Sequence, residues 1–280
     1  MRKNPREGEV INGLGSLKYV VIKSGEFDVA AKPKNPADPA IKTVDFVDTV
    51  TDNDGTRFNV VKIDEGAFKG CPNLSSVYVS PNIKDIGRSA FEGCPKLAYV
   101  RIESDLESIQ ARTFNKCPSL QTVELYCPLK SIEGHAFEKC MRLSKINLPD
   151  SLEEISDAAF LDNYSLLEVR LPKDLRRIGC RAFYNDRSLR VISFPEGLVS
   201  IGSGAFGKCV NLKEVDLKET GITTIEHSTF MGCTILSTLI LPKGIQSIGH
   251  SAFEGCGLLS VSIPPFSETY HKSRSHPDFL

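Results

Sequence analysis

The chain has 280 residues, and its 34 basic and 35 acidic side chains almost cancel. This balance gives no basic footprint for nucleic acid or for an anionic membrane surface. No apolar run approaches the roughly 20 residues that span a bilayer, and no apolar signal segment follows the charged start of the chain. We therefore expect neither membrane insertion nor a nucleic-acid partner, and the sequence leaves a cytoplasmic location open.

The first 62 residues carry no repeat, but they contain runs typical of β-strands. Apolar and β-branched residues at 17–22, 41–47 and 58–63 predict three strands. The proline-rich stretch 32–39 and the Asp-Asn-Asp-Gly sequence at 52–55 predict loops. Because the open end of a repeat array would expose its core and unpaired strand groups, we interpret residues 1–62 as a β-rich N-terminal cap.

A 23-residue repeat begins at Ile63 and continues to residue 264. In every repeat an Ile stands five residues before a Phe. Successive phenylalanines are 23 residues apart, except for one spacing of 24 near Gly221. The repeated phenylalanines are Phe68, Phe91, Phe114, Phe137, Phe160, Phe183, Phe206, Phe230 and Phe253. After each comes a turn and an L-x-x-V-x-L run, which predicts a strand with its apolar set facing inward. One such unit cannot bury enough apolar surface to fold alone, so the repeats must stack. We predict a repeat solenoid of about nine 23-residue coils with a parallel β-sheet face, followed by a tail or cap at 265–280.

The repeated unit carries a family resemblance. Ile178-Gly179-Cys180-Arg181-Ala182-Phe183 and Ile248-Gly249-His250-Ser251-Ala252-Phe253-Glu254-Gly255-Cys256 resemble the BspA-like leucine-rich repeat (LRR type 5), written I-G-x-x-A-F-x-x-C-x-x-L-x-x-V-x-L-P. The resemblance implies a right-handed leucine-rich repeat coil of the kind found in surface and secreted proteins of host-associated bacteria and mucosal protozoa. It implies an adhesin-like cell-surface protein that binds a host or partner protein through the sheet face. An intracellular leucine-rich repeat scaffold and the substrate-binding segment of a larger enzyme are the alternatives.

Seven of the nine cysteines share one repeat position, three residues after the Phe. They are Cys71, Cys94, Cys117, Cys140, Cys209, Cys233 and Cys256. Asn163 and Asp186 fill this position in the other two repeats. All three residue types can hydrogen-bond a turn backbone, which favours free, buried thiols, although stacked coils would also bring these positions within disulfide range. Zinc is disfavoured because one thiol per coil cannot surround a tetrahedral ion. Cys127 and Cys180 lie off this column, and we expect them to be exposed.

The sequence contains no recognised catalytic motif. The histidines do not form H-E-x-x-H, and no G-x-S-x-G elbow, phosphate-binding loop or dinucleotide fingerprint occurs. We therefore expect no catalytic, cofactor-binding or metal-binding residues and no enzymatic activity.

Outward residues of the strands provide the candidate partner-binding surface. Tyr78, Tyr99 and Arg101 belong to the residue types enriched in interface hot spots. The charged residues that follow alternate in sign from coil to coil, and cross-strand ion pairs on a solvated sheet are the favoured alternative interpretation for them. The predicted partner-binding residues are Tyr78, Tyr99, Arg101, Glu124, Lys145, Glu168 and Arg170. The identity of the protein partner and the oligomeric state are left open.

Overall fold

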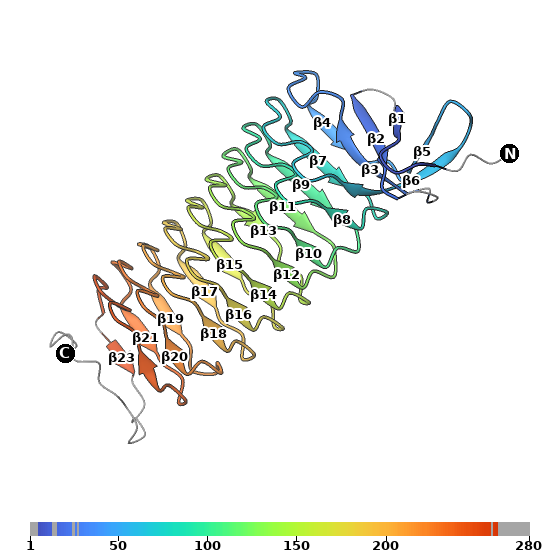
Figure 1. The fold of residues 1–280 in the computed structure, drawn as a ribbon. Helices are drawn as coiled ribbons and strands as arrows, with labels where there is room; N and C mark the ends of the chain where they lie inside the picture. The colour runs from blue at the N-terminus through green and yellow to red at the C-terminus, as the bar shows by residue number, and fades with distance from the viewer. Residues whose placement is uncertain (1–4, 13–15, 24–25, 27, 259, 263–280) are drawn as a thin grey trace. The chain divides into compact units, whose positions relative to one another are not determined.

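The computed structural model describes residues 5–12, 16–23, 26, 28–258 and 260–262. The chain divides into two compact units, residues 1–149 (unit 1) and 150–280 (unit 2). Strands and turns form both units (Figure 1). The expected tail at 265–280 lies outside the described residues. Across the part of the chain that is described, no helix has the length and apolar character needed to cross a membrane.

Unit 1 begins with a β-rich segment. One sheet has the strand order β1-β2-β3-β6-β5, and β4 instead pairs in parallel with the first long strand of the repeats. The strands are β1 (Val10–Asn12), β2 (Leu17–Val21), β3 (Asp28–Pro33), β4 (Thr43–Asp45), β5 (Thr49–Thr51) and β6 (Arg57–Ile63). Three of them coincide with the predicted strands. β3 was not predicted, because Ala30 and Ala31 have low strand propensity and the pairing of β3 with β2 and β6 decides its conformation.

Each coil of unit 1 contributes one longer strand to a parallel sheet and one two-residue strand. The longer strands are β7 (Ser76–Val79), β9 (Tyr99–Ile102) and β11 (Thr122–Leu125), and β13 (Lys145–Ile146), with only two residues, continues the same sheet. The short strands are β8 (Asp85–Ile86), β10 (Ser108–Ile109) and β12 (Ser131–Ile132). Equivalent residues of successive coils pair in register.

Unit 2 repeats this arrangement. Its longer strands are β15 (Glu168–Arg170), β17 (Val191–Ser193), β19 (Glu214–Asp216), β21 (Thr238–Ile240) and β23 (Ser260–Ser262). Its short strands are β14 (Glu154–Ile155), β16 (Arg177–Ile178), β18 (Ser200–Ile201), β20 (Thr224–Ile225) and β22 (Ser247–Ile248). All the pairs in this unit are parallel and in register, so both units confirm the predicted repeat solenoid.

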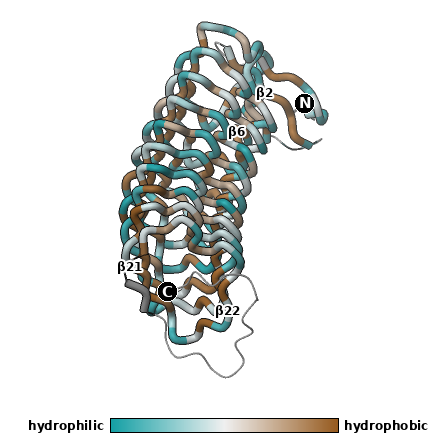
Figure 2. Tube along the Cα trace, turned by 90° about the vertical axis from the view of Figure 1, so that its left-hand side faces the viewer, coloured by the Kyte–Doolittle hydropathy of each residue, from teal (hydrophilic) through white to brown (hydrophobic). Residues whose placement is uncertain are grey.

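The core of each unit consists of columns of equivalent side chains, and hydrophobic and hydrophilic segments alternate around each coil (Figure 2). The phenylalanines stack with ring centroids 5.3–5.4 Å apart in unit 1 and 5.2–5.7 Å apart in unit 2. A further buried column, three residues before the repeated Ile, was not predicted. It comprises Ile83, Leu106, Leu129, Leu152, Leu175, Leu198, Ile222 and Ile245.

The turn after each Phe holds the column of cysteines, which we call the thiol ladder. Each described coil places the residue before the ladder position, such as Gly93 or Lys116, in the left-handed region, which favours glycine there. Thiols donate hydrogen bonds to the Phe carbonyl of the preceding coil: Cys94 Sγ lies 3.0 Å from Phe68 O. The ladder cysteines are free, and all but the half-buried Cys256 are buried, as predicted.

The two cysteines outside the ladder differ from each other. Cys180 is exposed, as predicted, whereas the prediction for Cys127 is wrong because its side chain is buried. Cys127 occupies the coil position that Ser104 occupies one repeat earlier, and Ser104 is also buried. Burial raises the pKa of the Cys127 thiol to about 11, so the residue is a small apolar filler and not a reactive surface group.

Candidate functional site

The sheet of unit 1 places alternate side chains on its outer face. In β7, β9 and β11 the apolar residues are buried and the residues between them are half-exposed. In-register pairing puts Tyr78 beside Arg101 and Arg101 beside Glu124. Adjacent strands lie about 4.8 Å apart, so these long polar side chains can reach one another across the sheet.

Three strands are linked through hydrogen bonds on this face. The Tyr78 hydroxyl donates to Glu103 Oε2 at 2.8 Å, and the Tyr99 hydroxyl donates to Glu124 Oε2 at 2.8 Å. Arg101 lies between the two carboxylates. Its Nε donates to Glu103 Oε1 at 2.7 Å, its Nη2 contacts the same oxygen, and its Nη1 donates to Glu124 Oε2 at 3.4 Å. One guanidinium therefore joins two tyrosine–carboxylate pairs.

The ionisation of these groups follows from the same contacts. Hydrogen bonds from the Tyr78 hydroxyl and then from Arg101 lower the pKa of Glu103. The bonds to carboxylates raise the pKa values of the Tyr78 and Tyr99 hydroxyls. The tyrosines therefore remain neutral donors and Glu103 an anionic acceptor through the neutral pH range.

An exposed aromatic ring completes the group. The Arg101 guanidinium lies over the Tyr126 ring, 5.0 Å from its centroid, and Tyr126 is 56% exposed. We call this set the tyrosine–arginine surface; it consists of Tyr78, Tyr99, Arg101, Glu103, Glu124 and Tyr126. Sequence reasoning missed Glu103 and Tyr126. Both residues stand directly after the strand, at the repeat position where later coils have Pro149 and Pro172. A polar or aromatic side chain in place of proline was the signal in the sequence that could have identified them.

The other predicted site residues are not part of this network. Lys145 lies exposed in β13, and its neighbour Asn147 is bonded to the backbone of Leu125 through both ends of its side-chain amide. Glu168 and Arg170 lie exposed in β15 of unit 2, where neither has a side-chain hydrogen bond or ion pair with another described residue of that unit. The pairing of Lys145 with Glu168 stays a prediction.

The histidines of the described part of the chain make local contacts at turns and belong to no cluster of metal ligands. Among the described residues, no group of three or more His, Cys, Asp and Glu side chains is placed to hold a metal ion. His135 Nδ1 lies 2.8 Å from Glu138 Oε2 at a turn, and His227 Nδ1 accepts a hydrogen bond from the His250 amide. The first contact lies within one turn, and the second joins the turns of neighbouring coils.

Comparison with known proteins agrees with this architecture. The family described as BspA type leucine rich repeat region matches residues 55–168 and 153–273, in six copies. No curated protein matches the chain.

Three solved bacterial structures share the fold. A leucine-rich repeat protein from Bacteroides ovatus is 23% identical over 90% of this chain and 82% of its own, with a TM-score of 0.51. The pneumococcal vaccine antigen PcpA is 22% identical over 93% and 82%, with a TM-score of 0.52. A leucine rich cell surface protein from Faecalibacterium prausnitzii is 20% identical over 94% and 96%, with a TM-score of 0.50.

Proposed function

Because the chain belongs to the BspA-type leucine-rich repeat family, we propose that it is a non-enzymatic recognition protein that binds a partner protein through the tyrosine–arginine surface. The observation that carries this proposal is the placement of Arg101, which bonds Glu103 and Glu124 and covers Tyr126. Tyr and Arg side chains dominate binding energy at interfaces. Side chains that are already fixed in place lose less conformational entropy on binding.

The setting we propose is that of an adhesin-like protein at the cell surface. The printed name of the Faecalibacterium prausnitzii structure is that of a cell surface protein, and PcpA is named as a vaccine antigen. Both names agree with a surface role. We also propose partner contacts for Lys145 in unit 1 and, within unit 2, for Glu168 and Arg170, all of which are exposed charged residues of the kind found at interface rims.

A second candidate, an intracellular scaffold that uses the same surface, is favoured by one observation. All nine cysteines are free thiols, and free thiols are typical of reducing compartments. The two candidates share the binding surface and differ in compartment and partner.

The experiment compares binding of the wild-type chain with that of a variant carrying Tyr78→Ala, Tyr99→Ala and Arg101→Ala. Binding is measured to epithelial cells, to immobilised matrix proteins and to a lysate fraction of the producing cell. We expect the triple variant to bind the partner at least about 30-fold more weakly, since hot-spot losses exceed about 2 kcal/mol. Arg142→Ala, an exposed change at a turn of unit 1, serves as the matched control. Equal binding by the wild type and the triple variant would refute the proposal.

A further inference from the structure

The parallel sheet of unit 2 is interrupted at one step. β15 pairs with β17, and β19 pairs with β21, but within the described chain β17 and β19 belong to separate sheets. On either side of the interruption the coil-to-coil hydrogen bonds are intact: the Arg190 amide donates to Leu167 O, and the Ser237 amide donates to Lys213 O, each at 3.0 Å. The irregularity is therefore confined to a single step between neighbouring coils.

Two departures from the repeat coincide with this step. Phe194 stands where unit 2 otherwise has buried leucines such as Leu171 and Leu217, and its half-buried ring packs edge-on against Phe206 with centroids 5.6 Å apart. Phe46 makes the same kind of contact with Phe68 in unit 1, where β4 and β7 remain paired. An edge-on Phe ring is thus not sufficient to separate neighbouring strands. The second departure, the extra residue that gives the 24-residue spacing from Phe206 to Phe230, falls between β19 and β20 and is absent from unit 1, whereas Val191 of β17 and Glu214 of β19 keep the regular spacing of 23.

A hollow lies on the sheet face at this step. It has a volume of about 680 Å³, within the range of ligand sites, and adjoins a second hollow of about 390 Å³ over β15. The two share Val191, Ser193 and Phe194 in their lining. Val191 is 54% exposed, which is unusual for a strand Val, so the shared centre is apolar and open to solvent. We call the combined feature the β17 hollow.

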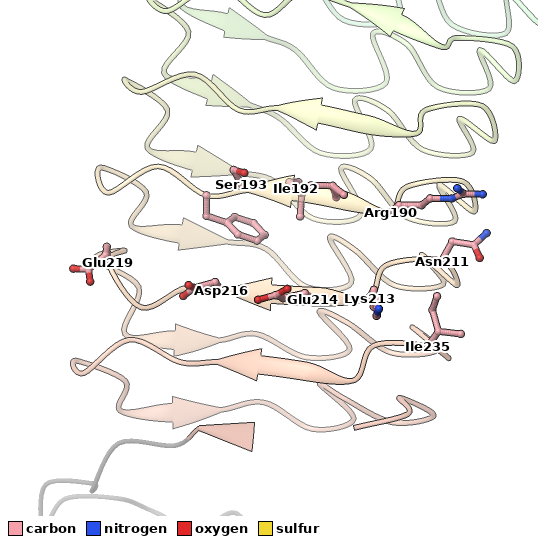
Figure 3. A pocket seen from close by; sticks show the side chains of 11 residues that line it. Arg190, Ile192, Ser193, Asn211, Lys213, Glu214, Asp216, Glu219 and Ile235 are labelled. Atoms are coloured by element: carbon pink, nitrogen blue, oxygen red, sulfur yellow. The ribbon is translucent and has the colours of Figure 1, made fainter. Parts of the chain in front are cut away.

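Charged side chains of opposite sign flank this apolar centre at the carboxyl ends of the strands. Arg170 and Lys173 line the β15 side. Asp216 and Glu219 line the β19 side, as Figure 3 shows together with Glu214 along β19. The two sides are at least two strand spacings apart, at least about 10 Å, so they do not neutralise each other directly.

The local partners of these charges leave the hollow polarised. Neither Arg170 nor Lys173 has a side-chain partner among the described residues. On the other side Asp216 accepts the Lys218 amide, and Glu219 pairs with Lys218 at 3.2 Å.

The amino ends of the strands carry a different pattern of charges. Glu168 lines the β15 side, whereas Arg190 and Lys213 directly precede β17 and β19. Asp150 also lines the second hollow, but it stands 23 residues before Lys173 and so lies at the carboxyl ends, next to the basic residues there. At the carboxyl ends, Arg170 and Lys173 on the β15 side oppose Asp216 and Glu219 on the β19 side, whereas at the amino ends Glu168 opposes Arg190 and Lys213. Because the order of charges is reversed between the two ends, a charged peptide that crosses the strands should bind in one direction at the carboxyl ends and in the opposite direction at the amino ends.

We propose that the β17 hollow binds an extended peptide segment of a partner protein in which an apolar side chain is flanked by an acidic and a basic side chain. The apolar side chain packs on Val191 and Phe194. The acidic side chain faces Arg170 and Lys173, and the basic side chain faces Asp216. In an extended segment alternate residues share one face and lie about 6.7 Å apart, so residues i, i+2 and i+4 span the hollow.

This site uses only residues of unit 2 and none of the six residues of the tyrosine–arginine surface; it shares Glu168 and Arg170 with the further contact residues proposed above. The proposal therefore goes beyond the proposed function and does not depend on it.

The test uses a phage-displayed library of random peptides of about 12 residues, long enough for such a segment, selected on the 280-residue chain. Affinities of the selected peptides are measured by fluorescence anisotropy. We expect the peptides to share the acidic, apolar, basic order at alternate positions. Affinity should fall at least about tenfold for Asp216→Lys with Glu219→Lys, because the basic residue of the peptide would then face like charges. Affinity should also fall for Phe194→Leu, which restores the residue type of neighbouring repeats.

Matched controls distinguish recognition from bulk charge and from the first surface. Glu65→Lys with Glu254→Lys makes the same change in net charge at exposed residues outside the hollow, and binding should be unchanged. The variant with Tyr99→Ala and Arg101→Ala should also bind the peptides as the wild type does. This result is expected whether or not the tyrosine–arginine surface binds a partner. A peptide whose basic residue is replaced by Glu should bind the Asp216→Lys, Glu219→Lys variant better than the wild type.

Three results would overturn the proposal. They are a failure to enrich any peptide, enrichment of peptides without the charge order, and equal affinity for wild type and charge-reversed chain. Sedimentation of the unliganded chain adds a fourth: self-association that disappears on charge reversal would assign the hollow to a second copy of the chain.

Discussion

The two units build the same coil but differ in how their polar groups are satisfied. On the sheet face of unit 1, Arg101, Glu103 and Glu124 bond one another and two tyrosines. On the face of unit 2, Arg170 and Glu214 have no side-chain partner among the described residues. Regular stacking therefore does not by itself produce cross-strand pairing. Pairing also needs complementary residues at equivalent positions of adjacent, hydrogen-bonded strands.

The turn side shows the same contrast. All four ladder positions of unit 1 are cysteines, whereas unit 2 begins with Asn163 and Asp186, both fully buried. Asp186 Oδ1 accepts the Asn163 amide at 2.7 Å, but Asp186 Oδ2 and both polar atoms of the Asn163 side chain lack a partner. The repeat position that buries a thiol in unit 1 thus holds polar atoms without hydrogen bonds in the first coils of unit 2. Burying such atoms lowers the free energy of unfolding.

Exchanging the ladder residues between the units should give the largest effect. Cys94→Asp places a carboxyl in a fully buried position of unit 1, and we expect it to lower the free energy of unfolding by about 3–5 kcal/mol. Asp186→Cys should raise it by about 1–3 kcal/mol near pH 7, because it removes an unsatisfied buried carboxyl oxygen. Both are measured by equilibrium denaturation in urea.

Cys94→Ala is the control for this exchange. It removes the thiol that donates to Phe68 O without adding a charge, and should cost only about 1–2 kcal/mol. If Cys94→Asp proves no more destabilising than Cys94→Ala, the thiol ladder tolerates a carboxyl group. The different ladder residues of the two units would then not affect the free energy of unfolding.

The next effect is a pH dependence that arises from Asp186 of unit 2. Burial raises the pKa of Asp186 well above 3.8; the nearby Asp162 carboxyl raises it further, and the hydrogen bond from Asn163 opposes this. The unfolded chain releases the proton near its ordinary pKa, while the folded chain keeps it to higher pH. Unfolding therefore releases a proton between these two pKa values, and the free energy of unfolding falls as pH rises, by up to about 1.4 kcal/mol per unit.

Asp186→Asn isolates this contribution, because it keeps the shape of the side chain and removes the titration. The difference in free energy of unfolding between wild type and variant, measured from about pH 4 to pH 8, should shift with rising pH in favour of the variant. Parallel curves would mean that Asp186 ionises in the folded chain with its ordinary pKa.

The coil was predictable from the sequence because each of its positions is specified many times. The Phe column and the inward strand residues recur at one spacing, so the period alone identifies them. β3 was missed because its alanines form a strand only through pairing with β2 and β6, which are distant in sequence. Local pattern carries no information on such pairing.

The site was predictable only in part. The alternation of the strands places Tyr78, Tyr99 and Arg101 on the outer face, but their hydrogen-bonding partner Glu103 lies just beyond the strand, where alternation ends. The β17 hollow arises where the repeat is broken, at Phe194 and in the 24-residue spacing. A periodic pattern identifies what the coils share, whereas these features depend on how one coil differs from its neighbours.

The smallest effect should come from the face of unit 1 itself. Tyr99→Phe and Arg101→Met each remove hydrogen bonds from the network, yet Arg101 is partly exposed, with 39% of its side-chain surface open to water. Water replaces lost partners at such positions, and exposed ion pairs contribute little to folding. We expect neither variant to move the urea midpoint more than Arg142→Ala does. A larger shift would mean that the network holds unit 1 together, in which case loss of binding on mutation would no longer distinguish recognition from folding. An unchanged midpoint combined with weakened binding would instead show that unit 1 orders these side chains for contact with a partner.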